Sequence, residues 1–133
     1  MGWSSSFIDF DNDGDVDIFK ANGELKHLYG QEDQVFENLD GEKFRDASVE
    51  LGAYFQEELV GRGACFGDYD NDGDLDIFGS AEGYNNISWW ENNGSQEFIR
   101  HSITSEFSGA RTVFASDVDR DNDIDVLGAA YYD

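Results

Sequence analysis

Three stretches of nine residues carry an aspartate at every odd position. Oxygens at alternate positions of a short loop can surround Ca²⁺, which takes about 6–8 oxygen ligands at roughly 2.3–2.6 Å. Without a cation, five carboxylates this close together repel one another and resist leaving water. We therefore predict about three bound Ca²⁺ ions, in loops named A (residues 9–17), B (68–76) and C (117–125). The candidate metal ligands are Asp9, Asp11, Asp13, Asp15, Asp17, Asp68, Asp70, Asp72, Asp74, Asp76, Asp117, Asp119, Asp121, Asp123 and Asp125.

The positions within each loop are expected to play different roles. The first, third, fifth and ninth would give side-chain oxygens, and the seventh its backbone carbonyl. Gly14 and Gly73 occupy the sixth position, where the chain must turn sharply and glycine accepts a positive φ without steric cost. Asn122 takes this place in loop C and also tolerates the left-handed region. In loop A the side-chain ligands are then Asp9, Asp11, Asp13 and Asp17, and Asp15 gives a carbonyl.

The residues around the loops argue against an EF-hand. An EF-hand needs a glutamate at its twelfth position and a helix on each side. The twelfth positions here are Lys20, Gly79 and Gly128. The flanking segments, such as residues 6–8 and 16–19, are short runs of β-branched and aromatic residues, which are typical of strands. Each loop is therefore expected to join two strands of a β-hairpin.

The overall charge limits the classes of partner. The chain has 30 acidic and 8 basic residues, a net charge of −22, and the three loops hold 15 of the acids. Even with three Ca²⁺ bound, a charge of about −16 would repel nucleic acids and anionic membranes. We therefore expect no nucleic-acid partner, and no membrane insertion because no apolar run is long enough to span a bilayer. With 39% hydrophobic and 15% aromatic residues, the chain is expected to fold.

The spacing of the loops predicts the architecture. They begin at Asp9, Asp68 and Asp117, which are 59 and 49 residues apart. Periods of about 40–50 residues with four strands each are typical of propeller blades. Asp-Gly and Asn-Gly also mark hairpin turns at residues 38–41 and 92–95. We predict an all-β fold of about ten strands, which is two and a half blades: residues 1–60, 61–109 and a partial blade 110–133.

The loops resemble the FG-GAP repeats, also called VCBS repeats, of integrin-α-like β-propellers, whose signature is D-x-D-x-D-G-x-x-D between hydrophobic strands. Residues 2–80 are most similar to cartilage-acidic-protein-like repeats, in segments such as Phe36-Glu37-Asn38 and Gly61-Arg62-Gly63-Ala64. Residues 86–103 resemble the outer hairpin of another subgroup of the same superfamily. The resemblance implies a calcium-stiffened propeller in a secreted or surface protein, engaged in adhesion or in recognition of carbohydrate or protein.

The number of blades also bears on partners. Propellers close with about four to eight blades, so two and a half cannot form a ring. Each end should expose an uncovered blade face, and such faces recruit partners. Either the chain is a fragment of a larger propeller, or it is a homo-oligomer whose copies form a closed ring or an open filament. The expected partner is accordingly a protein or carbohydrate ligand, or further copies of the chain.

Three roles stay open at this point: a recognition or adhesion module with Ca²⁺ as a structural ion, a self-assembling structural protein, and part of a polysaccharide-active enzyme. We expect no enzyme activity and no catalytic residues, because the carboxylates that glycoside hydrolysis would need are committed to the metal. Calcium loops without a bidentate glutamate suit the millimolar calcium found outside cells. The expected location is extracellular, at the cell surface, or periplasmic.

A few residues outside the loops could carry further chemistry. Trp89 and Trp90 are adjacent and point to opposite faces of a strand. We expect both to pack in the core rather than to serve as a sugar-stacking platform. Cys65 is expected to be a small buried hydrophobe. Asn86 and Asn93 both satisfy the N-glycosylation spacing, and Asn93 lies on a predicted turn, which makes it the better acceptor.

Overall fold

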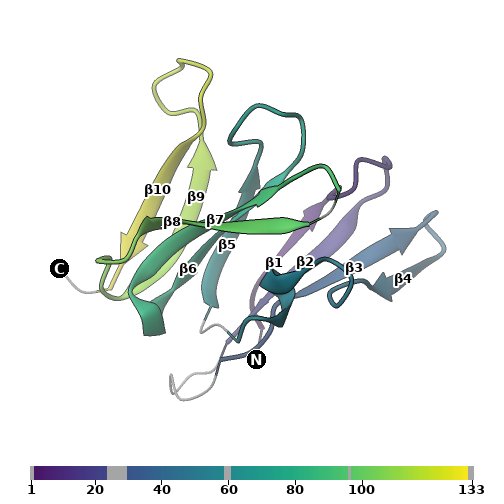
Figure 1. Cartoon of the computed structure of the whole chain (residues 1–133), viewed down its shortest axis with the longest axis horizontal. Helices are drawn as coiled ribbons and strands as arrows, with labels where there is room; N and C mark the ends of the chain where they lie inside the picture. Colours follow the sequence, from purple (N-terminus) through teal and green to yellow (C-terminus); the bar gives the residue numbers. More distant parts are fainter. Residues whose placement is uncertain (1, 24–29, 59–60, 96, 132–133) are drawn as a thin grey trace.

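The computed structural model describes residues 2–23, 30–58, 61–95 and 97–131, and within these ranges the chain is all-β (Figure 1). Ten strands form three antiparallel sheets, as the sequence predicts, and two short 3-10 helices lie between them. The strands are β1 (Gly2–Ile8), β2 (Asp17–Asn22), β3 (Gln34–Leu39), β4 (Lys43–Asp46), β5 (Gly61–Gly67), β6 (Asp76–Ala81), β7 (Asn86–Asn92), β8 (Phe98–Thr104), β9 (Ala110–Ser116) and β10 (Asp125–Ala130). The helices are η1 (Ala53–Gln56) and η2 (Glu82–Tyr84).

Each sheet follows the order of the chain. Sheet I has the strand order β1-β2-β3-β4 and sheet II the order β5-β6-β7-β8, while β9 and β10 pair as sheet III. The predicted Asp-Gly turn is confirmed between β3 and β4, because Asp40 and Gly41 both have positive φ, as type I′ hairpin turns require. The N–H of Glu42 closes this turn by donating to the carbonyl of Leu39 at 3.0 Å. The division of the chain into propeller blades stays a prediction.

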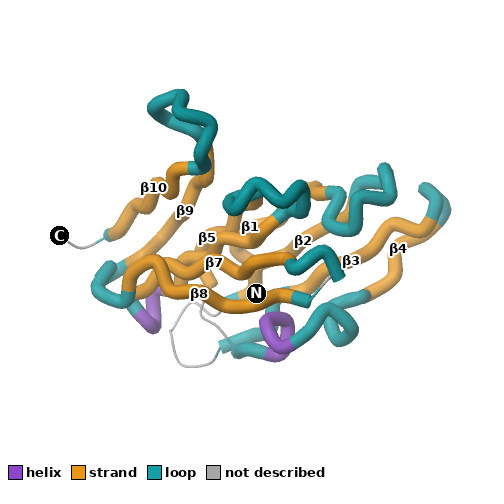
Figure 2. Tube along the Cα trace, turned by 45° about the horizontal axis from the view of Figure 1, so that its top comes forward, coloured by secondary structure: helices purple, strands orange, loops and turns teal. Residues whose placement is uncertain are grey.

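The sheets pack face to face, and their first strands β1, β5 and β9 lie side by side (Figure 2). Gly63 shows how closely the sheets approach. A Cβ at this position would stand 3.0 Å from Cα of Thr112 and 3.2 Å from the carbonyl oxygen of Arg111. Because both atoms belong to the backbone of β9, a larger residue at Gly63 would push β5 and β9 apart.

Two apolar clusters fill the spaces between the sheets. Sheet II is buried on both faces, because successive side chains of a strand alternate in direction. Thus Ile77 packs toward sheet I and its neighbour Phe78 toward sheet III. The first cluster consists of Ile8, Phe10, Phe19, Ala21, Val35, Ala47, Leu51, Tyr54, Phe55, Ile77, Trp90 and Phe98. The second consists of Phe78, Ile87 and Val113, with half-buried neighbours that include Trp89 and Cys65.

Asp33 is a buried carboxylate beside the first cluster. Its side chain is 5% exposed and accepts hydrogen bonds from the Tyr54 hydroxyl at 2.5 Å and from the Asn22 N–H at 2.6 Å. Burial raises the pKa of Asp33 to about 6, although both hydrogen bonds favour the ionised form. The pair joins η1, which connects sheets I and II, to the start of β3.

We expect Asp33 to make folding depend on pH. Because its folded pKa lies above the unfolded value of 3.8, its stabilising contribution is complete below that value and is lost as the pH rises through about 6. The loss amounts to roughly 3 kcal/mol. Urea unfolding in calcium should therefore show that wild type loses about this much more stability than Asp33→Asn between pH 4 and pH 7. The loop carboxylates are the same in wild type and in Asp33→Asn. The difference between the two pH profiles therefore reports the contribution of Asp33 alone. Parallel pH profiles would contradict the assignment.

Candidate metal sites

Loops A, B and C lie at the same edge of the molecule. Each joins the first two strands of a sheet: β1 to β2, β5 to β6, and β9 to β10. Figure 1 shows all three loops at the upper ends of their hairpins. The prediction that each loop connects two strands is therefore confirmed, and an EF-hand arrangement is absent at these three loops.

Three aspartates of each loop bring carboxylate oxygens within 4.8 Å of one another. In loops A and B these are the first, third and fifth positions, whereas loop C uses the first, third and ninth. The carboxylate triads are Asp9–Asp11–Asp13, Asp68–Asp70–Asp72 and Asp117–Asp119–Asp125. The remaining six candidates lie outside the triads, and their part in metal binding stays a prediction; they are Asp15, Asp17, Asp74, Asp76, Asp121 and Asp123.

The backbone turns sharply at two places in each loop. The predicted positive φ at the sixth position is confirmed: it is 93° at Gly14, 97° at Gly73 and 76° at Asn122. The fourth position has a positive φ as well, which the sequence analysis missed; the values are 58° at Asn12, 62° at Asn71 and 68° at Arg120. Asparagine at this position in loops A and B was the available signal, because it tolerates the left-handed region.

Backbone N–H groups of each loop point at its first aspartate. In loop B, Asp68 accepts hydrogen bonds from the N–H of Asp72 at 3.0 Å and of Gly73 at 3.1 Å, one on each carboxylate oxygen. Asp9 accepts the matching pair in loop A at 3.1 and 3.2 Å. Asp117 accepts two such bonds in loop C. The loop backbone is thus wound around its first carboxylate, which holds the triad together.

The ninth aspartate ties loop B to the third strand of its sheet. Asp76 is fully buried, with 0% of its surface exposed. One oxygen accepts a hydrogen bond from the N–H of Tyr69 at 2.9 Å, and the other from the N–H of Asn92 at 2.8 Å. Tyr69 lies between the first two members of the triad, and Asn92 is the last residue of β7. Asp76 therefore fixes the loop to the sheet, whether or not it also contacts an ion.

Loop A repeats this arrangement with different partners. Asp17 accepts hydrogen bonds from the N–H of Phe10 at 3.2 Å and of Asn38 at 2.7 Å. Asn38 and Asn92 are therefore structural residues of the loops that the sequence analysis did not identify as such. Each follows a glutamate and begins a hairpin turn, and this shared context was the signal. Asp125 of loop C lacks the second bond in the described part of the chain and accepts only from Val118, at 2.9 Å.

Burial and mutual repulsion raise the pKa of several loop carboxyls. Burial raises the pKa of Asp76 to about 6, with a smaller contribution from the negative charges of Asp70 and Asp72. The pKa of Asp17 is raised for the same reason, with Asp13 and Asp9 as the repelling charges. A bound dication would remove this penalty, because it favours the ionised form of every carboxylate around it.

The donor set fits a hard divalent ion. The triads offer carboxylate oxygens only, and soft sulfur or imidazole ligands are absent from them. Carboxylate and carbonyl oxygens suit Ca²⁺, Mg²⁺ and Mn²⁺ rather than Zn²⁺ or Cu²⁺. Flexible loops with many oxygens favour Ca²⁺ among these, because Mg²⁺ requires near-octahedral geometry and keeps several waters. The residues present are therefore suited to Ca²⁺.

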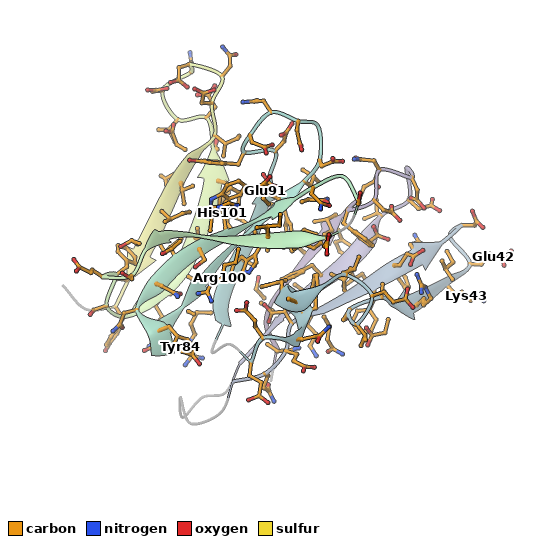
Figure 3. The ribbon with its side chains drawn as sticks, viewed as in Figure 1. Glu42, Lys43, Tyr84, Glu91, Arg100 and His101 are labelled. Carbon is orange, nitrogen blue, oxygen red and sulfur yellow. The ribbon has the colours of Figure 1, made fainter. Side chains whose placement is uncertain are left out.

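Both tryptophans pack against other side chains. Trp90 is buried in the first cluster, as predicted. Trp89 is half-buried and contacts two rings: His101, which stacks on it with centroids 4.6 Å apart and 19° between the planes, and Tyr69, whose centroid is 4.7 Å away. His101 also contacts Glu91 across β7 and β8, with 2.7 Å from Nε2 to Oε2 (Figure 3). The predicted core position thus holds fully for Trp90 and in part for Trp89.

The remaining candidates are also placed. Cys65 lies half-buried in β5, and burial raises the pKa of its thiol to about 11, as expected of an unreactive cysteine. Asn93 is exposed on the turn between β7 and β8, whereas Asn86 is half-buried at the start of β7. Glycosylation at either position stays a prediction. Among the residues that the structure describes, no helix has the length and apolar character needed to cross a membrane.

Comparison with known protein families agrees with the repeat seen in the sheets. The profile of the FG-GAP-like repeat matches residues 9–79 and, a second time, residues 68–128. The two matches overlap at loop B, so each repeat runs from one aspartate loop to the next. The chain therefore belongs to the FG-GAP-like repeat family. The closer similarity of residues 2–80 to cartilage-acidic-protein-like repeats stays a prediction, and a search among curated proteins found no match.

Proposed function

We propose that this chain is a calcium-binding segment of a β-propeller in an extracellular, cell-surface or periplasmic protein, where it acts in recognition or adhesion. In this proposal sheets I, II and III are blades within residues 1–60, 61–109 and 110–133. The observation that carries the proposal is the carboxylate triad, which recurs three times at one edge of the molecule. Membership of the FG-GAP-like repeat family supports the same reading.

Calcium would act as a structural ion. When bound, it supplies the positive charge that the clustered carboxylates need in order to stay ionised and close together. The chain's own residues position the loops. Backbone N–H groups hold the first aspartate of each loop, and the ninth aspartate of loops A and B fixes the loop to the third strand. Because the unfolded chain has no preformed site, binding free energy adds to folding free energy.

We further propose that the chain is not itself an enzyme. Most of its clustered carboxylates belong to the metal loops, where they would be occupied by the ion. His101 is engaged by Glu91 and Trp89, and the raised pKa of Cys65 keeps its thiol protonated near neutral pH. Activity on a polysaccharide would then belong to another part of a larger protein. Recognition of a protein or a carbohydrate needs only a rigid surface, which the calcium loops would supply.

Self-association is a second candidate, because both outer faces of the stack expose aromatic or aliphatic side chains. On sheet I, Phe7 is 78% exposed and lies opposite Ile18 of β2, which in turn lies opposite Phe36 of β3. On sheet III, Phe114 is 61% exposed and lies directly opposite Leu127. Exposed rows of this kind mark interaction surfaces.

The internal interface indicates how these faces could fit each other. Phe66 of sheet II is covered by Phe19 of sheet I, with ring centroids 5.1 Å apart. Phe7 stands at the same place as Phe66, two residues before its loop, and Leu127 stands at the same place as Phe19, two residues after its loop. Leu127 of one copy could therefore cover Phe7 of the next. Repeated head-to-tail, this contact gives a ring or a filament.

Light scattering in millimolar calcium, followed by a glycan array, tests both candidates. A recognition module is expected to be a monomer. In calcium it should bind a restricted set of glycans or a single protein partner, and this binding should be lost in EGTA. A self-associating chain should instead show a mass that grows with concentration. Phe7→Ser should abolish that growth, whereas Val49→Ser, which also replaces a side chain that is 78% exposed, should not. A monomer at all concentrations would rule out the second candidate.

A further inference from the structure

Loops A and B are connected by hydrogen bonds that run from one sheet to the next. The Nδ2 group of Asn92, in sheet II, donates to the backbone carbonyl of Phe10, in loop A, at 3.4 Å. At the surface, Nδ2 of Asn12 in loop A donates to Oδ1 of Asp74 in loop B at 3.0 Å. A displacement of either loop therefore strains the hydrogen bonds that it makes with the other.

Asn92 is the buried centre of this connection. Its backbone N–H donates to Asp76, its Nδ2 group reaches the carbonyls of both Leu75 and Phe10, and its Oδ1 accepts from the N–H of Gly94 at 3.2 Å. Only 1% of the residue is exposed. Bonds in such a place are stronger than bonds in water, and leaving one of these groups unpaired is costly.

The connection continues to the ligands of loop A. The N–H of Phe10 donates to Asp17, and Phe10 lies between Asp9 and Asp11, two members of the triad. Phe10 is itself buried in the first apolar cluster and cannot move freely. A continuous chain of buried groups thus runs from Asp76 of loop B, through Asn92 and Phe10, to Asp17 of loop A.

We propose that Asn92 couples the two loops, so that Ca²⁺ bound in one raises the affinity of the other. This inference rests on the proposed function, since it assumes that both loops bind calcium. An ion that orders loop A fixes Phe10, and through Asn92 it also fixes Asp76 and the start of loop B. Loop B then loses less conformational freedom when its own ion binds, which is positive cooperativity, and the effect is reciprocal.

Asn38 provides the matched control. It stands in sheet I where Asn92 stands in sheet II, donates its N–H to Asp17, and bonds the carbonyl of Val16 through Nδ2 at 3.1 Å. Its Oδ1 accepts from the N–H of Gly41 at 3.0 Å. These bonds all stay within sheet I. Asn38→Ala keeps the backbone bond to Asp17, as Asn92→Ala keeps the bond to Asp76, and it removes the corresponding local side-chain contacts. It leaves the connection between the loops intact.

Isothermal titration with CaCl₂ tests the coupling through the affinity of loop B. All chains carry Asp119→Ala to silence loop C, and loop A is switched off in half of them by Asp13→Ala. In the chain that keeps Asn92, loss of the loop A site should lower the calcium affinity of loop B about tenfold, within the range usual for coupled sites. In the Asn92→Ala background, loss of loop A should lower the calcium affinity of loop B much less, because only the exposed bond from Asn12 to Asp74 still joins the loops. In the Asn38→Ala background the tenfold effect should return.

The outcomes separate the two levels of the proposal. An equal effect of Asp13→Ala in all three backgrounds, or no effect in any, would overturn the coupling and leave calcium binding in place. A chain that binds no calcium in any background would refute the proposed function and the coupling with it. Circular dichroism in calcium checks that each variant folds. Should Asn92→Ala not fold, Asn92→Ser, whose side chain is too short to reach Phe10, replaces it with the same expected result.

Discussion

Removing calcium with excess EGTA is expected to lower the melting temperature of the chain by roughly 25–40 °C. At a hundredfold excess over the dissociation constant, each ion stabilises the fold by about 2.7 kcal/mol, and three ions by roughly 8 kcal/mol. For a chain of 133 residues, 1 kcal/mol corresponds to about 3–5 °C. The repulsion among the loop carboxylates acts in the same direction, because nothing then offsets it.

Differential scanning calorimetry at pH 7 measures this effect. Scans in 5 mM CaCl₂, in EGTA, and in EGTA with calcium restored in excess separate ion removal from any effect of the chelator. A matched series in MgCl₂ tests the preference for the larger ion. A melting temperature that differs by less than about 3 °C between calcium and EGTA, under 1 kcal/mol, would show that the loops do not stabilise the fold through an ion.

Replacement of Asp76 by alanine should have the largest effect of any single loop substitution. Two N–H groups, of Tyr69 and Asn92, lose their acceptor, and Asn92 is buried. An unsatisfied buried donor costs about 1–3 kcal/mol, so with the weakened calcium site the total loss is about 4 kcal/mol. Asp125→Ala is the matched control, because Asp125 holds the same place in loop C but accepts one bond, from the exposed Val118.

Urea unfolding in saturating calcium distinguishes these two variants. Asp76→Ala should lose more unfolding free energy than Asp125→Ala, by the roughly 1–3 kcal/mol that the unsatisfied buried donor costs. Asp17→Ala, which removes the matching pair of bonds in loop A, should lose more than Asp125→Ala but less than Asp76→Ala, because Asn38 is less buried than Asn92. Equal losses for Asp76→Ala and Asp125→Ala would mean that the bonds to the third strand contribute little, and that any effect comes from the ion alone.

The sequence predicted the loops and hairpins because their information is local. Alternating aspartates, Gly14 and Gly73 at the turn, and Asp-Gly before β4 each act within a few residues. The predicted turns at residues 38–41 and 92–95 connect β3 to β4 and β7 to β8, where the sequence places them. Because each strand pairs with the next one along the chain, the strand order of each sheet follows from the order of the hairpins.

The contacts that join the loops to the sheets could not be predicted in the same way. The bond from Asn38 to Asp17 spans 21 residues, and the bond from Asn92 to Asp76 spans 16. The bond from Asn92 to Phe10 spans 82. Such contacts depend on how the strands pack in space, and no local pattern reports them. The same holds for the half-burial of Trp89, which is decided by His101 and Tyr69 on other elements.

Loop C shows a further limit. Its aspartates have the same spacing as those of loops A and B, yet its triad includes Asp125 in place of Asp121. In loops A and B the ninth aspartate is held by an N–H from the third strand, whereas the described part of sheet III has only two strands. The ninth carboxylate of loop C is therefore not held back by that bond and can join the triad. This difference comes from the surrounding sheet and not from the loop sequence.

The central claim is that the aspartate loops bind calcium, and a calcium titration of the chelator-treated chain tests it most directly. Isothermal titration at pH 7 should show about three ions bound per chain, with saturation in the millimolar range or below. Asp13→Ala, Asp72→Ala and Asp119→Ala, each of which removes a member of one triad, should each reduce the count by one ion. A flat titration of the wild-type chain up to several millimolar calcium, with the fold intact by circular dichroism, would contradict the account.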